Sequence, residues 1–280
     1  IWGVAPADGS RELVKTLHHE GREVGRSWSC DGFRALHLAG VRGTLDDGGL
    51  PSDVTHQAQQ MFANVGTMLE AEGYDFLQVA RTWIYLARLL DWYGEFNRVR
   101  TVYYTAQGMT GTPLDTVFPA STGIQGRTSD EECVMDVLAL APADGGNVRV
   151  EPILGSWRQP PAFSYGSSFS RGMTIEIEGR KTVLVSGTAS INSAGETTRV
   201  GDAEGQCLET LQDIAAILEE QGGGLESIAS ATVFCMTRVV YDAFSNVTRL
   251  LRVPFEARVP VIADVCRSDL LIEIEAVALI

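Results

Sequence analysis

The sequence is poor in the residues that build metal centres and disulfide frameworks. Its five cysteines are odd in number, widely spaced and never arranged as C-x-x-C, and its four histidines all lie in the first fifth of the chain. Structural zinc sites and disulfide frameworks need closer, paired spacing. The phosphate-binding loops G-x-G-x-x-G and G-x-x-x-x-G-K-S/T are absent as well. We therefore expect no metal, no disulfide and no cofactor.

Positive charge is also scarce, since 22 Lys and Arg stand against 36 Asp and Glu and the formal net charge is −14. This balance counts against nucleic-acid binding, which needs clustered Lys and Arg. An anionic ligand would need a locally positive pocket. No apolar run approaches the ~20 residues of a transmembrane helix. No signal peptide is visible after Ile1, and the missing Met indicates residues upstream. We expect a cytoplasmic protein that binds a small molecule, and neither nucleic acid nor membrane.

What the sequence does contain is a repeat. At roughly 150 residues per domain, a chain of 280 residues corresponds to just under two domains. The segment QAQQMFANVGTMLEAEG at 57–73 aligns with QCLETLQDIAAILEEQG, which lies 149 positions later at 206–222. Both segments have apolar residues at helical spacing and end at a glycine. Each is therefore predicted to be the first helix of one copy.

The same order of elements surrounds both helices. After each come a β-rich run (79–86 and 228–236), a second helix with aromatic anchors, a proline turn and a closing strand (134–140 and 271–279). A strand ending in small residues precedes each first helix (36–40 and 183–187). This order, β(β)-α-β-α-β, predicts an α+β fold of two tandem domains, each a mixed sheet with helices on one face. We place the domains at 1–145 and 162–280, and interpret the Gly-, Pro- and Asp-rich stretch 146–161 as a linker.

Short motifs in both copies resemble the Rid/YjgF superfamily of reactive-intermediate deaminases. The second copy reads FSRG at 169–172, VSG at 185–187, VP at 259–260 and IEIEAVA at 272–278. The superfamily reads roughly Y-S-Q-A, V-S-G-Q, F-P-A-R and I-E-I-E-A-I-A at those places. Its arginine, which holds the carboxylate of imino acids, is replaced by Ser121 in the first copy and Ile262 in the second. This departure counts against a simple imine deaminase.

A duplicated chain of this kind looks most like the chorismatases, which split pyruvate from chorismate. The strings FPASTGIQGR at 118–127, YGSSFSR at 165–171 and SGTAS at 186–190 carry the resemblance, together with Cys266 shortly before Glu273. The resemblance implies two Rid-type domains packed as a pseudo-oligomer within a monomer, with a degenerate first site and an active site beside the second domain. It also implies two product types, a dihydroxycyclohexadiene carboxylate formed by hydrolysis and 3-hydroxybenzoate.

Glu273 is the principal candidate for catalysis. Alternate side chains of a strand share a face, so Glu273 and Glu275 are expected to be neighbours in LLIEIEAVAL. Burial and a like charge both raise a carboxyl pKa, as a general acid working near neutral pH requires. The alternative is a solvent-facing carboxylate, the usual fate of Glu. We interpret Asp136 as the first copy's counterpart of Glu273, and more as a relic than as a catalytic residue.

Chorismate carries two carboxylates, so arginines with their planar fork of donors are the expected partners. Arg171 stands where the superfamily has Gln in Y-S-Q-A. Arg127 and Arg258 are further candidates, although each could be an ordinary surface residue. Tyr165 and Gln125 are the expected uncharged donors.

The remaining candidates concern the choice of product. Gly187 and Ala189 either leave room for the substrate ring or reflect only a turn. Cys266 is either a core filler or, as the resemblance implies, a catalytic residue that marks the 3-hydroxybenzoate type. We predict a chorismatase that forms 3-hydroxybenzoate and pyruvate after Glu273 protonates the enolpyruvyl methylene. The alternatives are a hydrolytic chorismatase, which gives 3,4-dihydroxycyclohexa-1,5-diene carboxylate, and a non-catalytic Rid-like ligand-binding protein.

Overall fold

The computed structural model describes residues 14–19, 21–30, 32–109, 118–126, 130–143, 146–253 and 257–280. The first copy contains six strands and two long helices: β1 (Val14–His19), β2 (Arg22–Cys30), β3 (Phe33–Arg42), α1 (Val54–Ala71), β4 (Val79–Leu86), α2 (Leu89–Ala106), β5 (Ala120–Gln125) and β6 (Cys133–Pro142). The second contains the same set: β7 (Val148–Ile153), β8 (Gly172–Ile177), β9 (Arg180–Thr188), α3 (Ala203–Glu220), β10 (Ile228–Cys235), α4 (Arg238–Leu251), β11 (Arg258–Ile262) and β12 (Ile272–Leu279).

The two sheets share one topology. The strand order is β1-β2-β3-β6-β4-β5 in the first sheet and β11-β10-β12-β9-β8-β7 in the second. β4 pairs antiparallel with β6 and parallel with β5, and β10 pairs in the same way with β12 and β11. The order of one sheet read backwards is therefore the order of the other. The predicted duplication and the α+β fold are confirmed.

The interpretation of residues 146–161 as a linker is wrong for part of that stretch. Val148–Ile153 forms β7, the edge strand of the second sheet, which pairs antiparallel with β8. Apolar and charged residues alternate at its start, the pattern of a half-exposed strand, and an edge strand tolerates Pro152. For the same reason Pro260 lies inside the edge strand β11 instead of a turn. The domain end at 145 lies outside the described residues and stays a prediction.

The first helix of each copy forms because a carboxylate caps its start and one apolar stripe faces the sheet. Asp53 accepts a hydrogen bond from the backbone N–H of His56 at 3.0 Å, and Asp202 accepts one from that of Gly205 at 2.9 Å. Such caps satisfy N–H groups that have no partner inside the helix. The predicted apolar stripes are fully buried: Phe62, Val65 and Leu69 in α1, and Leu211, Ile214 and Leu218 in α3.

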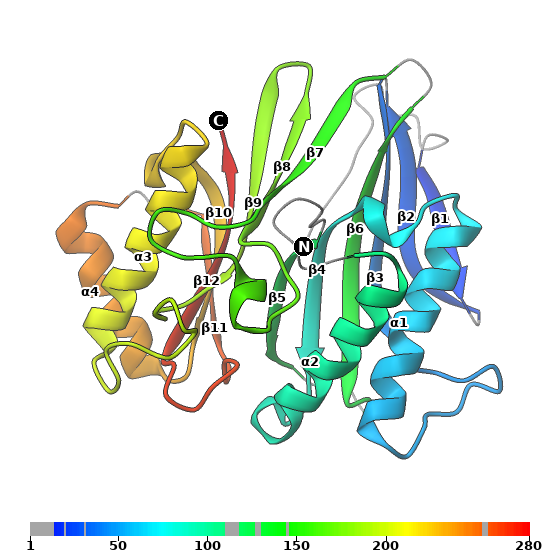
Figure 1. Cartoon of the computed structure of the whole chain (residues 1–280), viewed down its shortest axis with the longest axis horizontal. Helices are drawn as coiled ribbons and strands as arrows, with labels where there is room; N and C mark the ends of the chain where they lie inside the picture. The colour runs from blue at the N-terminus through cyan, green and yellow to red at the C-terminus, as the bar shows by residue number, and fades with distance from the viewer. Residues whose placement is uncertain are drawn as a thin grey trace.

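The helices lie outside and the two sheets lie between them (Figure 1). α1 and α2 cover one face of the first sheet, and α3 and α4 cover one face of the second. The remaining sheet faces share a small apolar cluster that includes Ala35, Leu140, Leu184 and Val277. Near β5 the backbones of the two copies are joined by a direct hydrogen bond, in which the N–H of Ser170 donates to the carbonyl of Pro119 at 3.0 Å. The two copies thus meet along a continuous seam.

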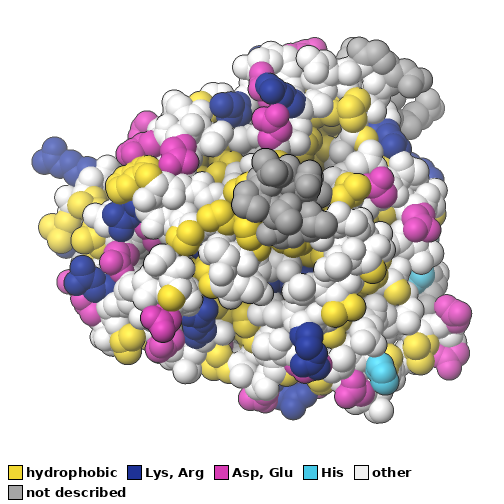
Figure 2. All heavy atoms as spheres, in the orientation of Figure 1, with side chains coloured by type: hydrophobic (Ala, Val, Ile, Leu, Met, Phe, Trp, Pro, Cys, Tyr) yellow, Lys and Arg dark blue, Asp and Glu magenta, His cyan; other side chains and the backbone are white. Residues whose placement is uncertain are grey.

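Charges of both signs are scattered over the surface. On the face drawn in Figure 2, Lys and Arg side chains stand singly among Asp and Glu. That face therefore offers no continuous basic patch to a phosphate backbone. In the part of the chain that the structure describes, no helix combines the length and apolarity needed to cross a membrane.

Candidate active site

A cavity lies in the seam, and both copies line it. The first copy contributes residues from α2 and β5: Tyr93, Arg100, Ser121 and Gly123. The second contributes residues from the segment that leads into β8, from β9 and the turn after it, and from β12 and the loop that leads into it: Tyr165, Ser167, Phe169, Arg171, Gly187, Ala189, Ile191, Cys266, Arg267, Leu270 and Glu273. A site of this composition exists only when the two copies are docked.

Most of the residues predicted from the sequence meet in this cavity. They are Tyr165, Arg171, Gly187, Ala189, Cys266 and Glu273. Arg258 does not line the cavity, because it stands at the opposite end of β11 from the part that lies level with Glu273. Gln125 lies at the end of β5, beyond the cavity, where its backbone N–H donates to Asp264. Arg127 lies outside the described residues.

Glu273 is buried on the central strand β12, between β9 and β10, with 5% of its surface exposed. No hydrogen-bond partner is found for its carboxyl among the described residues. Burial, and next the nearby carboxylate of Glu275, raise the pKa of Glu273 to about 8, while Arg81 acts in the opposite direction. The carboxyl is therefore mostly protonated at neutral pH. Such a carboxyl carries the proton that a general acid working near neutral pH requires.

Gly187 faces the Glu273 carboxyl directly. A Cβ atom at position 187 would lie 1.9 Å from Oε1 of Glu273, far inside any allowed contact. The same Cβ would lie 3.3 Å from the methyl group of Thr122. The Glu273 carboxyl therefore fills the space that a side chain at position 187 would need. That Gly187 also leaves room for the substrate ring stays a prediction.

Two arginines in the cavity wall are almost completely buried. Arg100 and Arg171 have 1% and 2% of their surface exposed. Arg171 donates through Nε and Nη2 to the carbonyl of Pro160 at 3.1 and 3.0 Å. Arg100 donates to Asn97 at 2.7 Å, while its Nε has no hydrogen-bond partner. Phe169 lies between them, its ring centre 5.9 Å from the guanidinium of Arg100 and 5.6 Å from that of Arg171.

The cavity is suited to an anion more than to a metal ion. Besides Arg100 and Arg171, it is lined by Arg267, which donates to the carbonyl of Gly195. Three arginines give a locally positive pocket in a chain whose net charge is −14. Among the described residues no group of three His, Cys, Asp or Glu side chains could hold a metal ion. The cavity thus provides fixed positive charge beside a proton donor.

Cys266 and Tyr93 are neutral groups at neutral pH. Burial, and next the charge of Glu273, raise the pKa of the Cys266 thiol to about 12. Burial also raises the pKa of Tyr93. A thiol whose pKa is raised this far keeps its proton, so Cys266 is poorly suited to accept one as a thiolate. Both groups can donate a hydrogen bond or exclude water.

The sequence reasoning did not place Tyr93, Arg100 and Arg267 in the site. Arg100 could have been found from the sequence, because it lies four residues from both Phe96 and Tyr104 and so falls on the apolar stripe of α2. A charged residue on the apolar stripe of a helix calls for a partner or a function. Ser121, noted above as the replacement of the superfamily arginine, does line the cavity. The positive charge lost at that position is supplied by other arginines.

The interpretation of Asp136 as the counterpart of Glu273 is wrong. β6 pairs with β4 as β12 pairs with β10, and equating the two registers matches Asp136 to Glu275 and Val134 to Glu273. The error arises because the segment between first helix and closing strand is ten residues shorter in the second copy. Sequence order alone did not fix the register. The first copy has an apolar residue where the second has its proton donor.

The fold and this cavity define a duplicated α+β protein with an arginine-lined cavity that holds a buried carboxyl between its copies. The profile of the Endoribonuclease L-PSP family matches residues 31–140 and 166–280, once in each copy. The chain belongs to this family.

Similar proteins and structures span most of the chain. The chain is 27% identical over 253 residues to a 3-hydroxybenzoate synthase of Streptomyces hygroscopicus, covering 80% of this chain and 70% of that protein. It is 26% identical over 311 residues to a chorismatase of Streptomyces rapamycinicus, covering 98% and 88%. A crystal structure of a chorismatase matches with a TM-score of 0.67 and 21% identity, covering 94% of this chain and 79% of that one. The resemblance to chorismatases expected from the sequence is confirmed.

Proposed function

We propose that the protein converts chorismate to 3-hydroxybenzoate and pyruvate. The observation that carries the proposal is the carboxyl of Glu273, buried in a cavity whose wall holds Arg100 and Arg171. Its burial raises its pKa to about 8 and so favours the protonated form at neutral pH. The similarity to a 3-hydroxybenzoate synthase and to a chorismatase supports this choice of substrate. Chorismate has two carboxylates and an acid-labile enol ether. Its cleavage therefore requires a proton donor beside fixed positive charge.

The arginines hold the two carboxylates of chorismate. Arg171 is already fixed by the carbonyl of Pro160, and Arg100 has an unpaired buried Nε. Charge-assisted hydrogen bonds to a carboxylate would satisfy such donors, and they are stronger in a buried site than in water. Tyr165, whose ring lies 5.3 Å from the guanidinium of Arg171, adds a neutral donor to the same wall. Fixed donors of this kind orient the substrate against the acid.

The reaction begins with proton transfer from Glu273 to the terminal methylene of the enolpyruvyl ether. The proton forms a methyl group, and the electron pair of the double bond is consumed, so positive charge develops on the ether carbon. The substrate carboxylate on that carbon and the ionised Glu273 stabilise this charge. The bond between the ether oxygen and the ring is then weakened, because its electron pair can move toward pyruvate.

The type of product depends on what attacks next. In the 3-hydroxybenzoate route, the neighbouring ring hydroxyl attacks the ring carbon that carries the ether and displaces pyruvate, so that its oxygen bridges the two ring carbons. The bond from this oxygen to its original carbon then breaks, and loss of a ring proton makes the ring aromatic. This route consumes no water and releases no net proton, so the proton given by Glu273 is returned from the substrate. In the hydrolytic route, one water attacks the ether carbon, pyruvate leaves, and the ring keeps both oxygens as two hydroxyls. Cys266, a partly buried neutral thiol in the same cavity as Glu273, favours the first route by occupying space that water would fill.

Incubation of the purified protein with chorismate tests the proposal. We expect pyruvate and 3-hydroxybenzoate in equal amounts, measured by a coupled pyruvate assay and by chromatography. In ¹⁸O-labelled water the phenolic oxygen of the product should stay unlabelled, because it comes from the substrate. Pyruvate together with the dihydrodiol would assign the hydrolytic type. Binding of chorismate without pyruvate release would assign a ligand-binding protein and reject an enzyme.

A further inference from the structure

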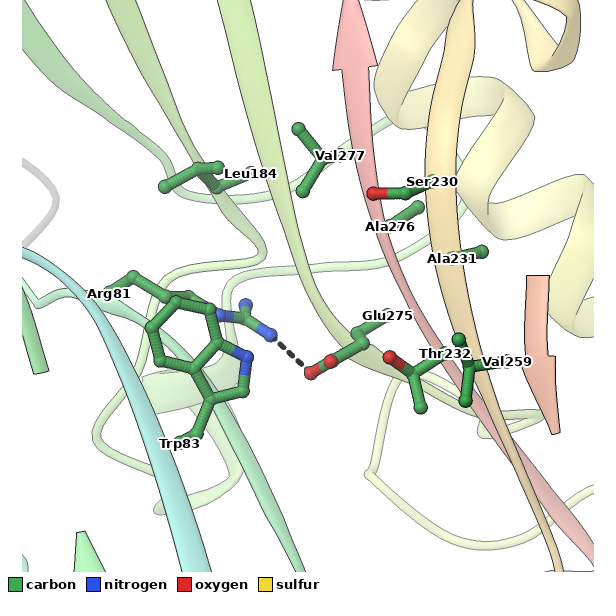
Figure 3. A pocket seen from close by; sticks show the side chains of 10 residues that line it. All are labelled: Arg81, Trp83, Leu184, Ser230, Ala231, Thr232, Val259, Glu275, Ala276 and Val277. Carbon is green, nitrogen blue, oxygen red and sulfur yellow. Dashed lines mark hydrogen bonds and ion pairs between the residues drawn. The ribbon is translucent and has the colours of Figure 1, made fainter. Parts of the chain in front are cut away.

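Arg81 reaches from the first copy into the second beside the active site. It lies on β4, and its side chain is 3% exposed. Its Nη2 pairs with Oε2 of Glu275 at 2.7 Å, and its Nη1 donates to the carbonyl of Val185 at 3.1 Å. Figure 3 shows this ion pair in the wall of a second cavity, with the ring of Trp83 next to it. A buried arginine thus neutralises a carboxylate of the other copy.

The carboxylate that Arg81 neutralises is the neighbour of the proton donor. Glu275 and Glu273 are two residues apart on β12, on the same face and roughly 7 Å apart along the strand. The hydroxyl of Thr122 donates to Oε2 of Glu275 at 2.6 Å. The methyl group of Thr122 packs toward Gly187, which in turn contacts the Glu273 carboxyl. One continuous wall therefore joins the Arg81–Glu275 pair to the acid.

We propose that Arg81 is a positioning residue for the proton donor: by neutralising Glu275 across the seam, it sets how readily Glu273 releases its proton. The inference rests on the proposed function, because that function gives Glu273 its role as an acid. It adds that the acid strength of Glu273 is adjusted by the copy that has Val134 at the matching position. The chemistry of the second copy is tuned by the docking of the first.

The direction of the effect follows from the charges. With Arg81 removed, the bare carboxylate of Glu275 opposes ionisation of Glu273, so the acid holds its proton more tightly. With Glu275 removed, the unpaired Arg81 favours the ionised form of Glu273, and the donor is lost at lower pH. With both charges removed, the two effects cancel. At the effective dielectric of buried sites, one charge at this distance shifts a titration by about one pH unit or more.

Other charged and titratable groups also face Glu273, and they are unchanged in these variants. From the first copy they are Tyr93 and Arg100 on α2. From the second they are Tyr165, Arg171, Cys266 and Arg267, with Glu275 on the same strand. The arginines lower the pKa of an acid and burial raises it. Because these contributions are common to all variants, differences between variants report the Arg81–Glu275 pair.

The test is a titration of Glu273 in the resting protein. Arg81→Gln, Glu275→Gln and the double variant are prepared with ¹³C-labelled glutamate carboxyls, and the Glu273 signal is identified by its loss in Glu273→Gln. We expect the midpoint to rise in Arg81→Gln, to fall in Glu275→Gln, and to return close to the wild-type value in the double variant. Arg88→Gln is the matched control, since it removes the same charge from an exposed arginine that pairs with Glu132 outside the cavity.

If Arg81→Gln fails to fold, the comparison of Glu275→Gln with the double variant still isolates the charge of Arg81, and the midpoint must be higher in the double variant. Unmoved midpoints with lowered melting temperatures would make Arg81 a structural link only and overturn the inference. The titration needs no turnover. Absence of pyruvate release with the expected midpoints would therefore reject the proposed function and leave the charge coupling standing.

Discussion

β6 and β12 occupy the same place in their sheets, yet of these two strands only β12 contributes a carboxyl to the lining of the active-site cavity. The position of Glu273 on β12 is filled on β6 by Val134, which is buried, and that of Glu275 by Asp136. Asp136 accepts a hydrogen bond from the backbone N–H of Gly40 at 2.6 Å, and so serves its own sheet. The two copies therefore contribute differently to the cavity. The second copy holds the proposed proton donor, and the first contributes part of the wall, including the buried Arg100.

The sharpest test of this division changes the carboxyl of each closing strand to an amide. We expect Glu273→Gln to fold and to lose pyruvate release by ~10²–10⁴-fold, because Gln keeps the volume and removes the transferable proton. The matched change Asp136→Asn should leave the rate within twofold of wild type, because Asp136 does not line the cavity. Steady-state pyruvate release measures both. A Glu273→Gln variant with more than half the activity would remove this residue from the acid role.

The contact between Gly187 and Glu273 gives the next largest effect. In Gly187→Ala the new methyl group collides with the carboxyl, which must turn away from its present place. Misplacement of a catalytic group by about 1 Å can cost ~10²-fold in rate. The control is Gly94→Ala on α2, where a Cβ meets nothing within 4 Å. Equal kcat values for the two alanine variants would contradict the assigned geometry.

The arginine wall is tested by removing one guanidinium from each copy. Arg100→Ala and Arg171→Ala should each weaken chorismate binding by roughly 2–5 kcal/mol, because a buried substrate carboxylate loses its partner. The effect should appear mainly in KM. Arg258→Ala, outside the cavity, is the control for a general loss of positive charge. If KM and kcat both stay unchanged in either cavity variant, that arginine does not contact the substrate.

The raised pKa of Glu273 predicts how rate and stability change with pH. The rate should fall as the pH rises through about 8, where the donor ionises. A carboxyl whose pKa is raised in the folded protein contributes stability that is fully present below its ordinary value of 4.5 and is lost as the pH rises through about 8. Its share of the unfolding free energy changes by on the order of 1 kcal/mol per pH unit. Urea unfolding between pH 5 and 8 should show this decline in wild type and lose it in Glu273→Gln.

Substitution of Cys266 is expected to have the smallest effect on the rate, because it alters the choice of product and leaves the proposed acid in place. In Cys266→Ala the space left by the thiol admits water next to the developing cation. The product ratio, measured by chromatography, should shift toward the dihydrodiol, or the reaction should slow. Cys235→Ala, a buried cysteine outside the cavity, controls for lost packing. An unchanged ratio and rate would leave Cys266 as a packing residue.

The helices and strands could be predicted from the sequence more fully than the contacts across the seam between the two copies. The stripe of Phe62, Val65 and Leu69 has a helical period that is visible within one segment. Glu273 could be found because a carboxylate stands among apolar residues of a strand. The roles of Arg81 and Arg100 depend on how two sheets pack against each other, which has no period along the chain. Asp136 was misassigned because strand register is set by pairing and not by sequence order.

The place of the closing strands has a consequence for how the protein is made. β6 enters its sheet between β3 and β4, and β12 enters between β9 and β10, so each central strand is synthesised after both of its neighbours. Until it arrives, the strands on its two sides lack the partner that joins them, and its pairing brings together segments that are distant in sequence, the kind of contact that slows folding. Glu273 is carried by the strand that completes the second sheet. A chain in which β12 has not yet paired therefore lacks the Glu273 carboxyl in its cavity.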